Sequence, residues 1–345
     1  MLKVNHGVMA AALAASPAYS SIEALPVRHI PAHDLPVPTT VSPQMQAAIA
    51  NAPPSVAPTS LPTTNAGWKE ASNPDPAKTH SDVLAVLSRL KLKLKETRFG
   101  GVHCYLITPE PSSSPPTRLL MYIHGGAYTG GAGESGLMEG LFVAGATRIE
   151  TVAVDYRMPP DHPFPAPLDD AIAVWKQLSG DYPRAKLGLF GSSTGGAMTL
   201  ALTQRSISEH LRVPDAVFAG SPWSDLSQTG DSYFSNRYTD PMVYEGGLSV
   251  SARQYANGLD LKDPRLSPVY GSFSNFPPTL LLSGTRDLFL SNTVRVAQKL
   301  RDADSPTELI VYEGQTHTAY LSGLDYPETQ AALRDISSFF RRNLK

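Results

Sequence analysis

The sequence predicts a fold of the α/β class, with a mostly parallel β-sheet covered by helices on both faces. From about residue 93, short apolar runs with strand character alternate with longer segments that have helical spacing. Such alternation is typical of parallel sheets whose strands are joined by helices. The length of 345 residues and the 41% share of apolar residues fit one large domain with a sizeable core.

The predicted elements can be assigned in chain order. We expect strands at Leu94–Arg98, Val102–Thr108, Arg118–Ile123, Glu150–Asp155, Leu187–Phe190, Ala216–Ala219, Thr279–Leu282 and Glu308–Tyr312. Between the later strands we expect helices at Leu137–Ala146, Pro167–Leu178, Gly195–Ser206, Ser291–Arg301 and Pro327–Arg341. Before them, one helix is predicted to begin after Ser42, which can cap it, and another to span His80–Leu92.

Two parts of the chain are predicted to form a helical cap over the sheet. The first part is residues 24–92, much of which is rich in Pro, Ala, Ser and Thr. The second is an insertion at about residues 222–270, with one short helical pattern around 248–255 and no convincing strand. A loop of this length inside a compact domain is usually functional. The main α/β domain is then residues 93–345.

Residues 1–23 are interpreted as an extension, with a weak secretory signal segment as the alternative. A lysine precedes the apolar run Val8–Ala15, and small residues follow it, which is the lower end of the signal-peptide range. We favour the extension, and with it a cytoplasmic location over a secreted or periplasmic one. No later segment of the sequence is long and apolar enough to form a transmembrane helix.

Charge and cysteine content exclude several classes of function. The net charge is −2 and no block of Lys or Arg occurs, so nothing favours nucleic acid or an anionic membrane as a partner. Cys104 is the only cysteine, which excludes an internal disulfide. No Cys-X-X-Cys or Cys/His cluster offers a zinc site. We therefore expect no metal and no cofactor, and we interpret Cys104 as a small buried side chain.

The strongest motif is Gly191-Ser192-Ser193-Thr194-Gly195, which lies between a predicted strand and a predicted helix. Gly-X-Ser-X-Gly in this context is a nucleophile elbow, whose flanking glycines leave room for a tight turn. The start of the helix would direct backbone N–H groups towards developing negative charge. The pattern predicts that Ser193 is a nucleophile. The alternative is a simple turn rich in Gly and Ser.

A serine nucleophile needs a general base that is oriented by an acid, and with this elbow they follow in the order serine, acid, histidine. Only His210 and His317 come after Ser193. His210 is interpreted as a residue at a helix end, whereas His317 lies in a loop after the last predicted strand. Asp287 follows a buried strand through a short turn, which predicts it as the acid. Helix capping by Asp287 is the alternative.

Two other aspartates of this region, Asp240 and Asp263, precede prolines in the irregular interval. We interpret both as turn residues.

A glycine-rich loop follows the strand predicted at 118–123. It reads His124-Gly125-Gly126-Ala127-Tyr128. Loops of this kind supply backbone donors opposite the nucleophile, so we predict an oxyanion hole made by this loop together with the N–H of Thr194. The alternative is a simple strand-to-helix turn.

With these motifs in this order, the chain resembles the hormone-sensitive-lipase family of α/β-hydrolases, also called bacterial family IV esterases. The resemblance spans roughly residues 35–345. It rests on HGGAY at 124–128, DYRMPPDHPFPAPLDD at 155–170, GSSTGG at 191–196, SPWSDL at 221–226, DPRLSPVYG at 263–271 and the run from Ser283 to His317.

The resemblance implies an α/β-hydrolase fold, with a mostly parallel eight-stranded sheet and a catalytic domain at residues 93–345. It implies a serine carboxylesterase that hydrolyses short- to medium-chain esters through an acyl-enzyme, with no metal or cofactor. Ser193 would be the nucleophile, His317 the base and Asp287 the acid. The expected partner is a small-molecule ester, and a homodimer is left open.

The resemblance also implies the oxyanion donors. They would be the N–H of Thr194 and two N–H groups among Gly125, Gly126 and Ala127, of which we select Gly125 and Gly126. His124 would then hold the loop in place.

The chain departs from the family pattern in three places. Ala127 stands where the usual loop has a third glycine, and Asp161 replaces a frequent glutamate. Ser192 and Thr194 replace the Asp and Ala of the frequent elbow Gly-Asp-Ser-Ala-Gly-Gly. A methyl group at residue 127 narrows the allowed backbone conformations. We expect these changes to alter the rate and the fit of the acyl group without removing activity.

Two other functions stay open. The same site could serve amide or lactone cleavage, acyl transfer or elimination, because fold alone does not decide the reaction. A non-catalytic ligand-binding member is the second alternative, although the intact Ser, Asp and His argue against it. A nucleotide-binding function is excluded, because the stretch Gly125–Gly136 has neither the Lys-Ser/Thr ending of a P-loop nor a Rossmann glycine pattern.

Overall fold

The computed structural model describes residues 28–345 except 54, 59, 73–74 and 113–114. The chain divides into two units, Met1–Pro36 and Val37–Lys345. The described residues of the first unit, 28–36, contain no helix or strand, and the extension predicted at 1–23 lies outside the described residues. Every helix and strand below belongs to the second unit.

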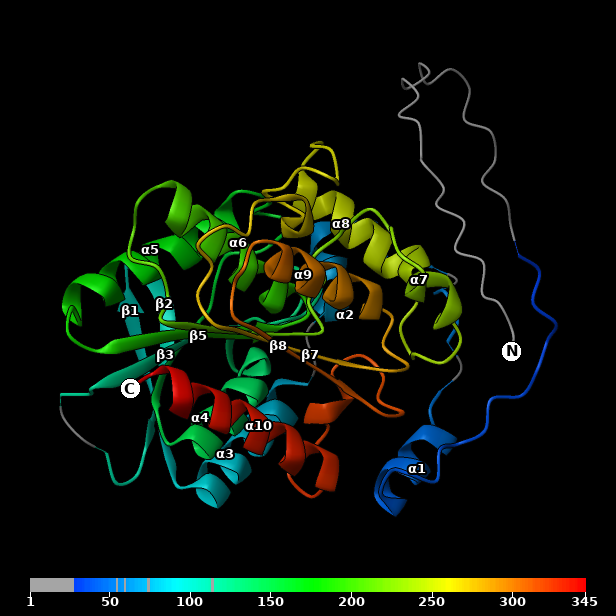
Figure 1. Cartoon of the computed structure of the whole chain (residues 1–345), viewed down its shortest axis with the longest axis horizontal. Helices are drawn as coiled ribbons and strands as arrows, with labels where there is room; N and C mark the ends of the chain where they lie inside the picture. The colour runs from blue at the N-terminus through cyan, green and yellow to red at the C-terminus, as the bar shows by residue number, and fades with distance from the viewer. Residues whose placement is uncertain (1–27, 54, 59, 73–74, 113–114) are drawn as a thin grey trace, which may run out of the picture. The chain divides into compact units, whose positions relative to one another are not determined.

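One eight-stranded sheet forms the centre of the second unit (Figure 1). Its strands are β1 (Leu92–Phe99), β2 (Val102–Pro109), β3 (Arg118–Ile123), β4 (Glu150–Val154), β5 (Lys186–Ser192), β6 (Ala216–Gly220), β7 (Thr279–Gly284) and β8 (Thr307–Tyr312). Their order in the sheet is β1-β2-β4-β3-β5-β6-β7-β8. β2 is antiparallel to both β1 and β4, and all other pairs are parallel. The predicted α/β fold and all eight predicted strands are confirmed.

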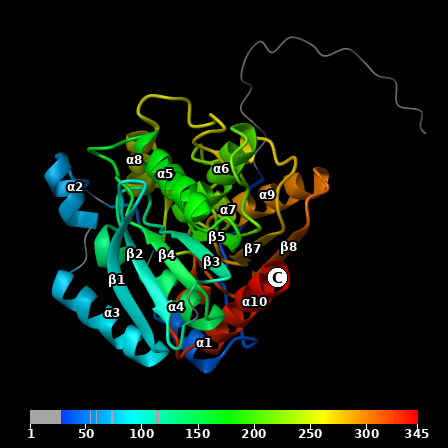
Figure 2. The same ribbon diagram turned by 90° about the vertical axis from the view of Figure 1, so that its left-hand side faces the viewer.

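Helices cover both faces of the sheet (Figure 2). They are α1 (Pro43–Ala50), α2 (Asn65–Ser72), α3 (Pro76–Leu90), α4 (Met138–Thr147), α5 (Ala166–Asp181), α6 (Thr194–Ser208), α7 (Ser232–Ser235), α8 (Ser249–Ala256), α9 (Leu290–Asp302) and α10 (Pro327–Asn343). α3, α4 and α10 lie on one face, and α5, α6 and α9 lie on the other. Parallel strands that are covered in this way are buried on both sides, which explains their nearly continuous apolar sequences.

The parallel arrangement brings the carboxyl ends of β3, β5, β6, β7 and β8 to one edge of the sheet. Ligands of open α/β sheets bind outside this edge. The functional site is therefore expected among the segments that follow these strands. They include the elbow at 191–195 and the loop at 124–128.

The prediction missed two helices, and both have weak sequence signals. α2 contains a glycine and only one large apolar residue, Trp68, and α7 is a single turn. The helix predicted after Ser42 is confirmed as α1, where the Ser42 hydroxyl accepts a hydrogen bond from the Met45 N–H at 3.1 Å. Residues 222–270 add α7 and α8 and, as predicted, no strand.

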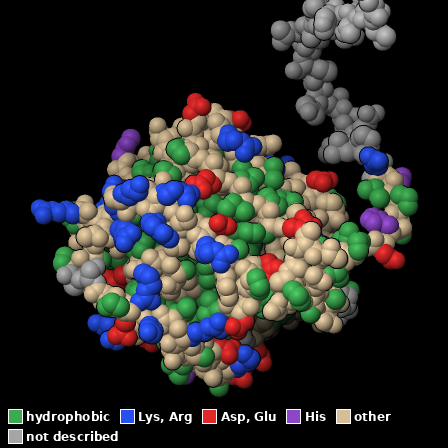
Figure 3. All heavy atoms as spheres, turned by 60° about the horizontal axis from the view of Figure 1, so that its bottom comes forward, with side chains coloured by type: hydrophobic (Ala, Val, Ile, Leu, Met, Phe, Trp, Pro, Cys, Tyr) green, Lys and Arg blue, Asp and Glu red, His purple; other side chains and the backbone are tan. Residues whose placement is uncertain are grey.

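Charged side chains of both signs are distributed over the face of the molecule in Figure 3, in keeping with a net charge of −2. None of the helices in the described part of the chain is long and apolar enough to cross a membrane. Cys104 is fully buried in β2, as predicted.

Candidate active site

The elbow at 191–195 is a sharp turn between β5 and α6. Ser193 has φ 59° and ψ −126°, a strained backbone conformation for a residue with a side chain. Its N–H donates to Gly220 O at 2.8 Å, and its carbonyl accepts from the Trp223 N–H at 3.0 Å. A Cβ on Gly191 or on Gly195 would collide with the carbonyl oxygen of Ile123 in β3. Glycine is therefore required on both sides of Ser193, as the motif predicts.

The loop after β3 lies against the elbow. A Cβ added to Gly125 would stand 3.2 Å from the Cβ of Ser193 and 3.0 Å from Ser192 O. Within the described part of the chain, the N–H groups of Gly125 and Gly126 donate no hydrogen bond. Donors next to a serine in this arrangement can stabilise a developing oxyanion. Ala127, the departure from the family pattern, has a left-handed φ of 54°, a conformation that glycine adopts more easily.

His124 stabilises this loop through its contacts with Tyr156 and Gly125. Its ring stacks on Tyr156, with centroids 4.1 Å apart and planes 10° from parallel. Its Nδ1 lies 2.7 Å from Gly125 O, and the Tyr156 hydroxyl donates to His124 O at 2.9 Å. Burial lowers the pKa of His124 and so favours the neutral ring. These contacts fit the loop-holding role that we expected.

Asp287 and His317 meet at the ends of β7 and β8. Nδ1 of His317 lies 3.2 Å from Oδ1 of Asp287. The same carboxylate accepts hydrogen bonds from the Ser283 hydroxyl at 2.7 Å and from the Phe289 N–H at 2.8 Å. The ring of Phe289 packs edge-on to the imidazole at 4.9 Å. The acid and the base predicted from the sequence are thus brought into contact.

The two members of this pair shift each other's pKa. Burial alone would raise the pKa of Asp287, but the hydrogen bond and the charge of His317 outweigh it, and the pKa is lowered. Burial alone would lower the pKa of His317, but the hydrogen bond and the charge of Asp287 outweigh it, and the pKa is raised. A carboxylate that favours the imidazolium form is what a catalytic base needs.

Ser193 and His317 are not joined by a hydrogen bond among the described residues. The predicted acid and base are therefore in contact, whereas the predicted nucleophile is not hydrogen-bonded to the predicted base. Such contacts are often long in ligand-free enzymes and shorten in complexes.

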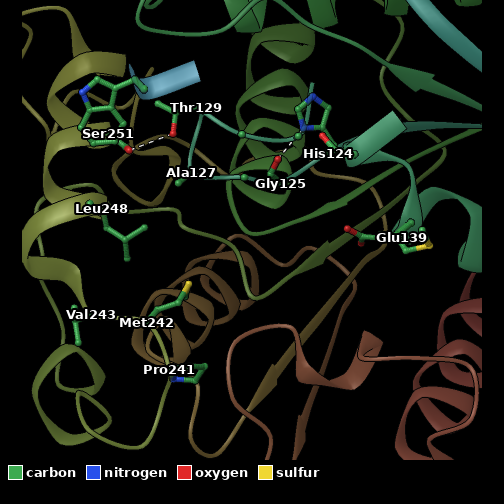
Figure 4. A pocket seen from close by; sticks show the side chains of 18 of the residues that line it. His124, Gly125, Ala127, Thr129, Glu139, Pro241, Met242, Val243, Leu248 and Ser251 are labelled. Atoms are coloured by element: carbon green, nitrogen blue, oxygen red, sulfur yellow. Dashed lines mark hydrogen bonds between the residues drawn. The ribbon is translucent and has the colours of Figure 1, made fainter. Parts of the chain in front are cut away.

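A cavity of about 650 Å³ adjoins the elbow through Gly125. Figure 4 shows Met242, Val243 and Leu248 on one side of it and Glu139 on another. Trp68 of α2 also lines the cavity. Its volume and mainly apolar wall are typical of sites for small organic molecules. Within the described residues, no group of three or more His, Cys, Asp or Glu side chains is arranged to hold a metal ion.

Comparison with known proteins identifies the family. A family model described as alpha/beta hydrolase fold matches residues 120–321, which is more than half of the chain. The chain belongs to the α/β-hydrolase fold family.

The relatives of this hydrolase include esterases. An esterase of Acinetobacter venetianus is 28% identical over 251 residues, which cover 72% of this chain and 82% of that protein. The crystal structure of esterase E25 is 35% identical and has a TM-score of 0.85, covering 92% of this chain and 99% of that one. A crystal structure of an esterase from the bacterial hormone-sensitive lipase family shares the fold, with 23% identity, a TM-score of 0.72 and coverage of 88% and 99%. The protein is an esterase of the α/β-hydrolase fold family.

Sequence reasoning missed Glu139 as a residue of this esterase's site. Oε1 of Glu139 accepts a hydrogen bond from the hydroxyl of Ser192 at 2.6 Å, and the carboxyl lines the cavity. Burial raises the pKa of Glu139 to about 7. No motif marks this residue, because it lies in the first turn of α4, where an acidic residue is ordinary.

Asp240 makes the contact expected of a turn residue and also makes contacts that the sequence did not predict. Its Oδ1 does accept the Met242 N–H at 2.9 Å, which is a local turn contact. The side chain is also fully buried, and its Oδ2 accepts hydrogen bonds from residues beside Asp287 and at His317. The sequence signal, Asp before Pro, is shared with surface turns and does not report this burial.

Proposed function

We propose that this esterase is a serine carboxylesterase that hydrolyses short- to medium-chain esters through an acyl-enzyme. The observation that carries the proposal is the strained Ser193 elbow at the same sheet edge as the Asp287–His317 pair. A serine held in this way, with a base oriented by a buried carboxylate, is the arrangement used for nucleophilic acyl transfer.

The proposed reaction has two halves. Ser193 Oγ attacks the ester carbonyl carbon while Nε2 of His317 takes its proton, and the carbonyl oxygen becomes an oxyanion. The C–O bond to the alcohol then breaks, and His317 gives the proton to the leaving alkoxide. In the second half, a water attacks the acyl-enzyme and loses a proton to His317. His317 then returns this proton to Ser193 Oγ as the C–O bond between the acyl group and the serine breaks, and the carboxylic acid is released.

The oxyanion is proposed to bind the N–H groups of Gly125, Gly126 and Thr194. The proximity of Gly125 to Ser193 and the unused donors of Gly125 and Gly126 support this assignment. Thr194 is the first residue of α6, where the N–H has no partner within the helix. The helix dipole favours negative charge at the same point.

Of the cap segments predicted at 24–92 and 222–270, we propose that residues 37–72 of the first and the whole of the second form the cap over the substrate. Val56, Pro58 and Trp68 of the first segment and Met242 and Leu248 of the second line the same cavity. The hydroxyl of Ser55 donates to Asp240 O, which joins the two segments. The acyl chain would lie against this apolar wall.

A series of p-nitrophenyl esters of increasing acyl length tests the substrate class. We expect kcat/KM to rise by up to about fourfold per methylene while the chain fills the cavity, since a buried CH₂ contributes about 0.8 kcal/mol. Beyond the medium-chain esters kcat/KM should fall, so that butyrate or hexanoate exceeds palmitate. The Ser193→Ala variant supplies the uncatalysed background. A folded enzyme that is inert on every ester, or most active on palmitate, would contradict the proposal.

Gly125→Ala tests the oxyanion loop. The added methyl must push the loop away from Ser192 and Ser193 by a few tenths of an ångström, and the displaced donors should lower kcat by about 10²-fold. The control is Gly180→Ala at the end of α5, where nothing lies within 4 Å of an added Cβ. That variant should keep the wild-type kcat. Equal kcat values for the two variants would rule out this loop as the oxyanion hole.

A further inference from the structure

Asp240 is a second buried carboxylate beside the Asp287–His317 pair, and the proposed mechanism does not use it. It lies between α7 and α8, and its side chain is fully buried. Within the described residues, no lysine or arginine forms an ion pair with it. Burying a carboxylate is costly unless other groups compensate its charge. The groups that surround Asp240 therefore indicate what it does.

Asp240 joins the acid segment to the base segment. Its Oδ2 accepts the Leu288 N–H at 2.9 Å and the His317 N–H at 2.8 Å. Leu288 directly follows Asp287, so one oxygen atom ties the backbone beside the acid to the backbone of the base. A bridge of this kind sets the position of the imidazole relative to Asp287. It requires an acceptor with no hydrogen of its own, as an ionised carboxylate has.

The charge of Asp240 also acts on the imidazole. The acidic groups around His317 are Asp287 at the end of β7, Asp240 between α7 and α8, and Glu139 on α4, and all three favour the imidazolium. Burial of His317 opposes them, and the net result is a raised pKa. Burial and, to a smaller extent, the charge of Asp287 raise the pKa of Asp240, while the charge of His317 and the N–H donors of Met242 and Leu288 oppose that rise. The imidazole thus contacts the carboxylate of Asp287 and is also within reach of the charge of Asp240, and both carboxylates accept hydrogen bonds from backbone N–H groups.

We propose that Asp240 is a positioning residue of this esterase, whose ionised carboxylate holds the acid segment and the base segment together through the N–H groups of Leu288 and His317. The proposal rests on the roles proposed above for Ser193, His317 and Asp287. It assigns Asp240 no contact with the substrate.

Asp263 is followed by proline, as Asp240 is, but it has no contact with Asp287 or His317 among the described residues. Its Oδ1 accepts the Arg265 N–H at 2.9 Å, the same local contact that Asp240 makes to Met242. Its carboxylate pairs with the exposed guanidinium of Arg265 at the surface. The chain therefore contains a matched control that keeps the turn and lacks the catalytic neighbours.

The test compares Asp240→Asn with Asp263→Asn in the full-length enzyme. Asparagine keeps the size of the side chain, but its amide group replaces one acceptor oxygen by a donor. The NH₂ group of the asparagine must face either the Met242 N–H or the N–H groups of Leu288 and His317. In either orientation at least one backbone N–H loses its hydrogen bond to a charged acceptor. We expect Asp240→Asn to lower kcat about 10- to 100-fold with little change in KM. Asp263→Asn should leave both constants unchanged.

The pH profile separates a positioning role from a merely structural one. Loss of the negative charge should lower the pKa of His317, so the acidic limb of kcat/KM should move to lower pH in Asp240→Asn and not in Asp263→Asn. Titration of the His317 imidazole by NMR should show the same shift without depending on turnover. An unchanged limb together with an unchanged imidazole titration would overturn the proposal, whatever the loss of kcat.

If Asp240→Asn does not fold, a measurement on the wild-type enzyme still tests the proposal. The ¹³Cγ resonance of Asp240 should report an ionised carboxylate throughout the titration of His317, and a protonated Asp240 in the active pH range would overturn the proposal. The underlying function is checked separately, because ester hydrolysis that does not depend on Ser193 would refute the proposed mechanism. The NMR titrations of Asp240 and His317 need no activity, so the two failures can be told apart.

Discussion

Ser193→Ala is expected to lower kcat/KM for p-nitrophenyl butyrate by about 10⁴- to 10⁶-fold, with the free energy of unfolding almost unchanged. The variant loses the atom that forms the acyl-enzyme, and no other hydroxyl has the same backbone position between β5 and α6. Alanine keeps the Cβ of Ser193 and loses only the hydroxyl, so the substitution adds no clash. Steady-state kinetics and urea denaturation of the same preparation measure the two quantities.

The adjacent serine is the matched control. Ser192 lies in the same elbow, but its hydroxyl donates to Glu139 at 2.6 Å. Ser192→Ala should lower kcat/KM by about 10- to 100-fold at most, the scale of one lost hydrogen bond to an acidic group, and so far less than Ser193→Ala. Diethyl p-nitrophenyl phosphate should label Ser193 in the wild type and in Ser192→Ala, as peptide mass spectrometry can show. Label on another residue, or full activity in Ser193→Ala, would refute the nucleophile.

Asp287→Asn should lower kcat by about 10⁴-fold while the geometry stays nearly intact. The neutral amide no longer fixes the imidazole in the tautomer that accepts a proton from serine, and it no longer stabilises the imidazolium. The pKa of His317 should fall, because its largest favourable partner is lost. The acidic limb of kcat/KM should therefore move to lower pH.

The control for Asp287→Asn is Asp302→Asn, at the exposed end of α9. It removes one negative charge at the far end of the helix that follows Asp287, about 18 Å along the helix axis, and should leave kcat and the pH profile unchanged. Retention of kcat within tenfold in Asp287→Asn would show that another group orients His317. Asp240 would then be the first residue to examine, since it already contacts the His317 backbone.

Much of the fold was predictable because the central strands, β3 to β7, are buried on both faces. Burial on both faces produces continuous apolar runs such as Leu119–Ile123 and Thr279–Leu282, and these runs mark strands even without alternation. The helices with long apolar stripes were also found. α2 was missed because it has a glycine and only one large apolar residue, and α7 because it is a single turn. Each is stabilised by contacts with distant parts of the chain.

The sequence was sufficient to predict the elbow at Ser193 and the pairing of Asp287 with His317. Their positions directly after strands were enough, because the carboxyl ends of parallel strands meet at one edge of a sheet. It did not determine the surroundings of His317. Asp240-Pro241 and Asp263-Pro264 have the same local pattern, and only tertiary packing buries one aspartate beside the base and leaves the other at the surface. Glu139 likewise has the sequence context of an ordinary helix residue. Only the tertiary structure brings its carboxyl to the hydroxyl of Ser192 in the elbow and buries it, which raises its pKa. Burial and charge at a site depend on segments that are distant in the chain, so these properties are decided by the tertiary structure.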